Sequence, residues 1–213
     1  AFDPDTGGYW EVASDGGVFA FNAPFDGSMG GKPLDKPIVG MAFDPNSGGY
    51  WLVASDGGIF SFGGAHFYGS MGGQQLVKPI VAITADPFTG GYWEVASDGG
   101  IFAFNAPFDG SMGGQALVKP VVGMAFDADS GGYWEVASDG GIFSFGGAAF
   151  LGSEGGHALD APIVGIADDA FTDGYWEVAS DGGLFAFNAP FNGSMGGHAL
   201  DKPIVAMSAA LVQ

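Results

Sequence analysis

The sequence contains no cysteine and no arginine, and only five of its 213 residues are lysine. The absence of cysteine excludes disulfide bonds and thiolate metal sites. With 24 acidic residues the net charge is −19, which disfavours nucleic acid and anionic membrane surfaces as partners, because both are bound through Lys and Arg. We therefore predict no nucleic-acid binding, and we attribute most of the acidity to a solvated surface.

Long apolar runs are also missing. No segment approaches the roughly 18 apolar residues that a membrane span needs, so we predict no membrane insertion. No stretch of helical length has apolar residues at helical spacing. The sequence starts at Ala1 without a signal peptide, so we expect a mature or trimmed product.

Glycine and aromatic residues are abundant, with 41 Gly, 20 Phe and five Trp. The apolar runs are short, rich in aromatic and β-branched residues, and bounded by Gly, Asp and Pro. Such runs are typical of strands joined by tight turns. The composition therefore predicts an all-β protein.

The motif Tyr-Trp-x-Val-Ala-Ser-Asp-Gly-Gly occurs five times, at intervals of 41 or 42 residues. A fixed period of this length is typical of stacked or ring-closed units. Repetition presents any surface feature five times, which suits multivalent binding better than catalysis. We therefore predict a binding function without catalytic residues.

The second repeat shows the predicted unit in full. Strands are expected at residues 37–43, 50–55 and 59–62, with a fourth near residues 67–70. Asp56-Gly57 is the dipeptide preferred in two-residue hairpin turns. Four short antiparallel strands in about 42 residues indicate a propeller blade.

The two ends of the sequence are complementary. The first repeat lacks its first strand, and the segment from Lys202 to Met207 aligns with the segment from Lys36 to Met41. We predict a single five-bladed β-propeller whose C-terminal strand completes the first blade. The expected blades are residues 1–35, 36–77, 78–118, 119–160 and 161–201, with the closing strand at 202–213.

A two-residue hairpin turn would also fix which side chains face one another. In the first repeat, Trp10 would lie opposite Phe21, and Val12 opposite Phe19. These bulky faces would pack between blades, so the repeated Trp and Phe side chains are expected to form mainly core.

Glutamate follows Trp in four repeats, whereas Leu52 takes this place in the second. A carboxylate in the middle of a strand is costly to bury without a partner. One interpretation is a set of carboxylates in clefts between blades that accept hydrogen bonds from sugar hydroxyls or bind cations. The other is a structural carboxylate that accepts from a neighbouring Trp indole or a Lys. The candidate ligand-binding residues are Glu11, Glu94, Glu135 and Glu177, together with Trp10, Trp51, Trp93, Trp134 and Trp176.

Other motifs predict no metal or cofactor. Turns such as the one from Asp3 to Gly8 faintly resemble a calcium loop, but Phe88 and Phe171 replace an oxygen ligand in two repeats. The Gly-rich stretches lack the lysine of a phosphate-binding loop. His66, His157 and His198 have no metal-ligand spacing.

The segment Gly49–Gly63, followed by Gly-Ser-Met-Gly-Gly and Lys-Pro-Ile-Val, closely resembles the tandem GYWxVASDGGxFxF repeat of secreted and cell-wall-associated actinobacterial proteins. The resemblance covers essentially the whole sequence and implies an extracellular or cell-wall-associated β-propeller. The sequence departs from the family pattern where Glu replaces Leu after Trp. The five-blade count also resembles the tachylectin-2 type of sugar-binding propeller, in architecture alone.

We therefore expect a non-enzymatic, extracellular, lectin-like module that binds carbohydrate or other cell-surface polymers. The alternative is a structural spacer, or a recently amplified or engineered repeat scaffold without a small-molecule ligand. The residues from Tyr9 to Gly31 and from Tyr92 to Gly114 differ at one position only, which agrees with recent amplification or construction. An enzyme is the third interpretation.

Overall fold

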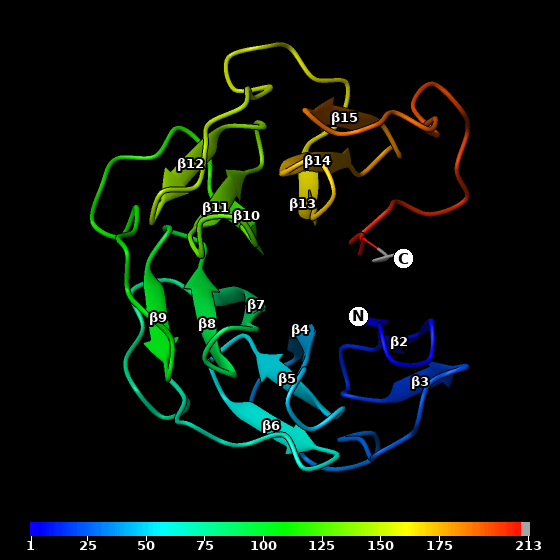
Figure 1. The fold of residues 1–213 in the computed structure, drawn as a ribbon, viewed down its shortest axis with the longest axis vertical. Helices are drawn as coiled ribbons and strands as arrows, with labels where there is room; N and C mark the ends of the chain where they lie inside the picture. The colour runs from blue at the N-terminus through cyan, green and yellow to red at the C-terminus, as the bar shows by residue number, and fades with distance from the viewer. Residues whose placement is uncertain (210–213) are drawn as a thin grey trace. The chain divides into compact units, whose positions relative to one another are not determined.

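The computed structural model describes residues 1–209, and these residues form an all-β chain without a helix. Their strands make five three-stranded antiparallel sheets, one for each repeat (Figure 1). Contacts divide the described residues into two units, residues 1–108 and residues 109–209. Within residues 1–209 there is no helix of the length and apolarity that a membrane span requires.

The first unit contains three sheets, each ordered as in the chain. Its strands are β1 (Phe2–Asp3), β2 (Gly8–Val12), β3 (Val18–Phe21), β4 (Ile38–Phe43), β5 (Tyr50–Ala54), β6 (Ile59–Phe62), β7 (Ile80–Asp86), β8 (Gly91–Ala96) and β9 (Ile101–Phe104). The second unit contains two sheets. Its strands are β10 (Val121–Phe126), β11 (Tyr133–Ala137), β12 (Ile142–Phe145), β13 (Ile163–Asp169), β14 (Gly174–Ala179) and β15 (Leu184–Phe187).

The Tyr-Trp-x-Val-Ala motif forms the middle strand of each sheet. In β5 all five residues are buried, so both faces of this strand are covered. Trp51 of β5 packs on Tyr92 of β8, with ring centroids 5.0 Å apart. The motif therefore supplies the core between neighbouring sheets of the first unit.

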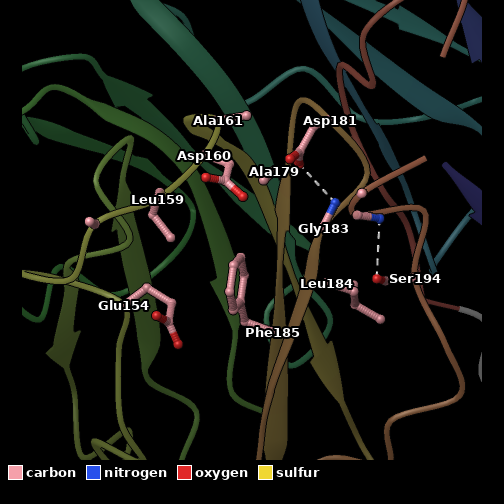
Figure 2. A pocket seen from close by; sticks show the side chains of 13 residues that line it. Glu154, Leu159, Asp160, Ala161, Ala179, Asp181, Gly183, Leu184, Phe185 and Ser194 are labelled. Atoms are coloured by element: carbon pink, nitrogen blue, oxygen red, sulfur yellow. Dashed lines mark hydrogen bonds between the residues drawn. The ribbon is translucent and has the colours of Figure 1, made fainter. Parts of the chain in front are cut away.

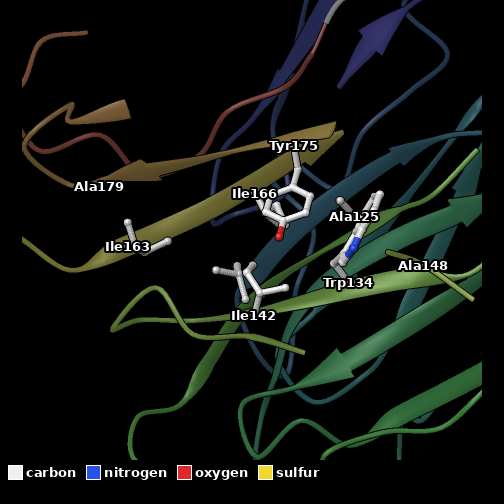
Figure 3. Packing of buried hydrophobic residues seen from close by; sticks show 9 residues of the cluster. Ala125, Trp134, Ile142, Ala148, Ile163, Ile166, Tyr175 and Ala179 are labelled. Atoms are coloured by element: carbon white, nitrogen blue, oxygen red, sulfur yellow. The ribbon is translucent and has the colours of Figure 1, made fainter. Parts of the chain in front are cut away.

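The second unit repeats this packing. Figure 3 shows Trp134 of β11 beside Tyr175 of β14, and their ring centroids are 5.0 Å apart. Ile163 and Ile166 of β13 belong to the same buried cluster. The sheet β10-β11-β12 thus packs on the sheet β13-β14-β15 through the Trp and Tyr of the repeated motif.

The predicted register of the hairpin is wrong by one residue. Trp10 pairs with Ala20, and Glu11 pairs with Phe19. The connection is a three-residue loop, in which Ala13 donates its N–H to the carbonyl of Gly17 at 2.8 Å. Gly16 takes a positive φ of 77°, as the last residue of such a loop requires. As a result, each Glu shares a face of its sheet with a Phe, and each Trp lies on the opposite face.

The predicted fourth strand is absent from the described residues. The segment near residues 67–70 is instead held by hydrogen bonds at two points. Trp51 Nε1–H donates to the carbonyl of His66 at 2.9 Å, and Tyr92 Oη–H donates to the carbonyl of Gly69 at 2.6 Å. Side chains from two adjacent sheets therefore replace the backbone pairing that a fourth strand would have.

The aspartate that ends the first strand of each repeat is buried and has partners. Asp86 accepts the backbone N–H of Phe88 at 2.9 Å and the hydroxyl of Thr89 at 2.6 Å. Equivalent carboxylates occupy the same turn in every repeat: Asp3, Asp44, Asp86, Asp127 and Asp169. Their oxygens stabilise the turn itself, which accounts for the calcium-like spacing in the sequence.

The C-terminal segment follows the course expected of a first strand. Ile204 donates its N–H to the carbonyl of Ser180 at 2.9 Å, as Ile163 does to Ser138 at 3.0 Å. Residues 202–209 form no strand. Residues 210–213 of the predicted closing strand lie outside the described residues.

Candidate functional site

The repeated tryptophans are buried in four of five copies. Trp51 and Trp93 are 0% exposed and Trp10 and Trp134 at most 2%, whereas Trp176 is half-buried. Each indole N–H donates to a backbone carbonyl, at 2.7 to 2.9 Å. The four buried rings therefore have no free face on which a sugar can stack.

The glutamates that follow these tryptophans fall into two groups. Glu94, Glu135 and Glu177 are completely buried, whereas Glu11 is exposed. None of them accepts the indole N–H that the structural interpretation offered as a partner, because the indoles bind carbonyls. The three buried carboxylates lie on different strands, β8 in the first unit and β11 and β14 in the second.

Burial is the main cause that raises the pKa of Glu94 and of Glu177 to about 8, from an ordinary value of 4.5. Near Glu94, the N–H of Met71 at 3.4 Å lowers the pKa and the charge of Asp56 raises it. Near Glu177, the charges of Glu154 and Asp139 both raise it. Both carboxyl groups therefore hold a proton at neutral pH.

The loop beside Glu177 carries a substitution that the other repeats lack. Glu154 stands where the other four repeats have methionine. No group among residues 1–209 donates a hydrogen bond to either oxygen of Glu177. The side chain of Glu154 is 22% exposed, and its Oε2 lies 3.2 Å from His157 Nδ1. The side chain of Glu154 is therefore close to Glu177, whose carboxyl oxygens receive no hydrogen bond from the described residues.

Glu154 also lines a cleft of about 300 Å³ in the second unit. Figure 2 shows Glu154, Leu159 and Asp160 on one side of this cleft, and Asp181, Phe185 and Ser194 on the strand and loop opposite. We call it the 154–194 cleft. Phe185 pairs with Glu177 across β14 and β15, so both side chains lie on the same face of the sheet. The buried Glu177 is therefore next to the residues that line the cleft.

The polar groups of the 154–194 cleft are almost all acceptors. Three carboxylates and one hydroxyl line it, without a Lys, Arg or His. Asp181 already accepts the N–H of Gly183 at 2.9 Å, which fixes its side chain. Leu159 and Phe185 add an apolar surface. A pocket of this size and lining fits one sugar residue, whose hydroxyls donate to carboxylates and whose C–H face packs on a ring.

The first unit has a cleft of similar volume but different chemistry. It measures about 280 Å³ and is lined by Asp56, Gln74, Leu76 and Lys78, among others. The Lys78 side chain offers a positive charge that the 154–194 cleft lacks. The two clefts therefore have different electrostatic character.

Glu154, Asp160 and Phe185 are not among the ligand-binding residues predicted from the sequence. Two signals were available for the first two, because Glu154 replaces a repeated Met, and Val77 and Val118 take the place of Asp160 in other repeats. We expected the repeated Phe side chains to form core, and this is wrong for the Phe that stands two residues before the Gly-Ser pair. These rings are 53% to 62% exposed in all five copies: Phe25, Phe67, Phe108, Phe150 and Phe191.

The calcium-like turns do not assemble a metal site. In residues 1–209, no three His, Cys, Asp or Glu side chains converge as metal ligands would. The carboxylates of Glu154 and Asp139 lie near Glu177, but these groups supply fewer ligands than the roughly six to eight that calcium takes.

No protein-family model and no curated protein matches the sequence. Among solved structures, the chain is similar to a structural genomics protein of unknown function from Bacteroides thetaiotaomicron VPI-5482, with 13% sequence identity and a TM-score of 0.44. That match covers 67% of this chain and 44% of the other, so this chain spans less than half the length of that protein.

Proposed function

We propose that the chain is a non-enzymatic carbohydrate-binding module whose strongest site is the 154–194 cleft. The observation that carries the proposal is the lining of this cleft, in which carboxylates of Glu154, Asp160 and Asp181 surround the apolar side chains of Leu159 and Phe185. This combination of acceptors and a ring suits a sugar better than a purely apolar ligand.

Weaker binding positions are also expected in the other repeats, because they share part of the lining of this cleft. Three of the lining residues, Asp181, Phe185 and Ser194, have an identical counterpart in every other repeat. The loop acid varies: three repeats carry Asp35, Asp160 and Asp201, and the other two carry Val77 and Val118. The proposed module has one strong site and weaker related positions, and a polymer that reaches several of them gains affinity. A cell-wall or extracellular polysaccharide is the proposed partner, and an extracellular location follows from that partner.

The test is titration calorimetry with oligosaccharides, comparing Asp160→Val with Asp35→Val. Asp160→Val introduces the residue that two other repeats carry, so it preserves the fold, and it removes one charged acceptor. We expect about one strong site per chain and about a tenfold loss of affinity in Asp160→Val, the cost of one charged hydrogen bond. Asp35→Val makes the same change at the equivalent position of the first repeat, outside this cleft, and is expected to keep the affinity.

Two results would count against this function. Equal losses in the two variants would show that the 154–194 cleft is not the main site. No binding of any oligosaccharide, with an unchanged melting temperature in their presence, would favour the structural spacer.

We further propose that the five sheets are the blades of one five-bladed propeller, closed by residues 202–207. Two observations support this. Ile204 is held as a first strand is held. The backbone of Ala206 and Met207 also lies within 4 Å of an ideal Cβ on Gly165 of β13.

A circular permutant tests the closure. The sequence would start at Lys36, and Met207 would be joined directly to Ala1, which makes the first repeat continuous. We expect urea unfolding to give a free energy equal to that of the parent within about 1 kcal/mol, because no native pairing is cut. A permutant that starts at Asp56, between β5 and β6, is the control and should be clearly less stable. If the Lys36 permutant failed to fold, the closure would be wrong.

A further inference from the structure

His66 and Tyr68 form a pair of aromatic rings at the surface of the first unit. Both side chains are exposed, and Tyr68 has 36% of its surface open to solvent. Their ring centroids are 4.5 Å apart, with the planes inclined by 59°. We call these two residues the 66/68 pair. Adjacent exposed aromatic side chains, unlike single scattered ones, are typical of interaction sites.

The repeated fold does not require this pair. In the fourth repeat, whose loop has the same length, Ala149 takes the place of His66. Leu151 likewise takes the place of Tyr68. The Trp indole of each repeat donates to the main-chain carbonyl at the first of these positions, at 2.9 Å in the second repeat and 2.8 Å in the fourth. The fold thus uses the main chain of this loop, and the two aromatic side chains are additional to it.

The main chain of the pair is fixed by two side chains that are 0% exposed, Trp51 and Tyr92. Trp51 binds the carbonyl of His66, as described above. The N–H of Tyr68 donates to Tyr92 Oη at 3.2 Å, and the Tyr92 hydroxyl donates in turn to the carbonyl of Gly69. The ring of Tyr68 also lies 6.2 Å from that of Tyr92, measured between centroids. A ligand therefore meets a loop that is already ordered, and binding costs little conformational entropy.

The two side chains combine apolar and polar groups in the way that a sugar requires. A pyranose ring has C–H groups that pack on an aromatic face, and hydroxyl groups at its edge. The phenol ring of Tyr68 supplies such a face. The imidazole of His66 and the hydroxyl of Tyr68 can both donate and accept hydrogen bonds.

The charges around the pair favour a neutral ligand. Exposed aromatic rings also attract ammonium and guanidinium groups. In the first and third repeats the position of Tyr68 is occupied by aspartate, Asp26 and Asp109. Residues 57–77, by contrast, contain no Asp, Glu, Lys or Arg. The loop of the second repeat thus has no carboxylate that would pair with a cation, and this favours a neutral sugar over a cationic peptide.

We propose that the 66/68 pair is a second carbohydrate site, which binds a neutral sugar by stacking and by hydrogen bonds to its hydroxyl groups. This inference rests on the proposed carbohydrate-binding function and adds a site whose chemistry differs from that of the acidic 154–194 cleft. The pair is more open to solvent than a cleft, so it covers less of a ligand and binds it more weakly.

The test is a titration followed by carbon–proton NMR of the histidine rings. The sequence contains three histidines, so their signals can be assigned one by one. His66 reports on the pair, and His157, which contacts Glu154, reports on the cleft. The probes are the neutral hexasaccharides of β-1,4-linked glucose and of β-1,4-linked N-acetylglucosamine, at constant pH. We expect at least one of them to shift the His66 signals in a saturable way, with an affinity that salt does not change.

Tyr68→Leu connects the binding to the pair. It introduces the residue of the fourth repeat, so the fold is kept, and it retains His66 as the reporter. We expect the affinity read from His66 to fall by about fivefold, because an aromatic contact is lost. Phe25→Ala is the matched control, because Phe25 is an exposed ring of the first repeat with no aromatic residue beside it. It should leave this affinity unchanged, and thermal unfolding checks that both variants are folded.

The outcomes separate this inference from the proposed function. If the sugars shift the signals of His157 but not those of His66, the second site is wrong and carbohydrate binding stands. Equal affinities of the parent and Tyr68→Leu at His66 would also rule out the second site. If tetralysine shifts the His66 signals and the sugars do not, the pair binds cations and the inference is wrong. If neither hexasaccharide shifts any histidine signal, the proposed function fails for these glycans, and the inference fails with it.

Discussion

Replacing Trp51 by alanine is expected to lower the free energy of unfolding by about 4 kcal/mol or more. The side chain is 0% exposed and packs on Tyr92 of the neighbouring sheet. Truncation of a buried Trp leaves a large cavity and typically costs about 3 to 5 kcal/mol. The carbonyl of His66 would also lose its donor. Urea denaturation followed by circular dichroism measures the change.

Phe67→Ala is the matched control for Trp51→Ala. Phe67 follows the residue that accepts the Trp51 hydrogen bond, yet its ring is 53% exposed. Its loss should change the free energy of unfolding by less than about 0.5 kcal/mol. If both substitutions changed the free energy of unfolding by a similar amount, Trp51 would not have the structural role proposed here. A role of the tryptophan in ligand binding would then have to be considered again.

Replacing Glu177 by leucine is expected to stabilise the protein at neutral pH. The folded pKa of about 8 lies above the ordinary value of 4.5, so between these values the folded state binds a proton that the unfolded state lacks. The contribution of Glu177 to stability is therefore most favourable below about pH 4.5 and becomes less favourable as the pH rises to about 8. At about pH 7 the solution is roughly 2.5 pH units above the pKa of the unfolded state, and each unit corresponds to about 1.4 kcal/mol. Burial of Glu177 therefore lowers the free energy of unfolding by about 3 kcal/mol at this pH, relative to acidic pH.

Glu177→Leu removes this cost, as Leu52 does naturally in the second repeat. Urea unfolding at about pH 7 should show a gain of about 3 kcal/mol, and the gain should shrink markedly at about pH 5. Glu94→Leu should behave in the same direction. Glu11→Leu is the control, because this side chain is exposed and its replacement should change little. A loss of stability in Glu177→Leu at pH 7 would contradict the unsatisfied burial of this carboxylate.

Sequence patterns predicted the sheets well because each strand carries its own signal. The Tyr-Trp-x-Val-Ala run is apolar on both faces, and it became the central strand in every sheet. The hairpin register was not predictable from Asp-Gly alone, because this dipeptide fits both a two-residue turn and a three-residue loop that ends in Gly. The prediction of a fourth strand was wrong for another reason. Hydrogen bonds from the side chains of Trp51 and Tyr92 hold that segment without backbone pairing.

The cleft was harder to predict than the fold. Burial of the Glu side chains was considered, but their position opposite Phe depends on the hairpin register, which was predicted wrongly. Glu154 is the one acid in place of a repeated Met, but its importance depends on Glu177, which is 23 residues later in the sequence and adjacent in space. A repeat comparison alone cannot supply that proximity.

The most direct measurement is a crystal structure of the protein with a bound oligosaccharide. We predict sugar density in the 154–194 cleft, with sugar hydroxyl groups beside Glu154 and Asp160 and a sugar ring against Phe185. Sugar bound elsewhere on the molecule, with this cleft empty, would contradict the assignment of this cleft as the main binding site.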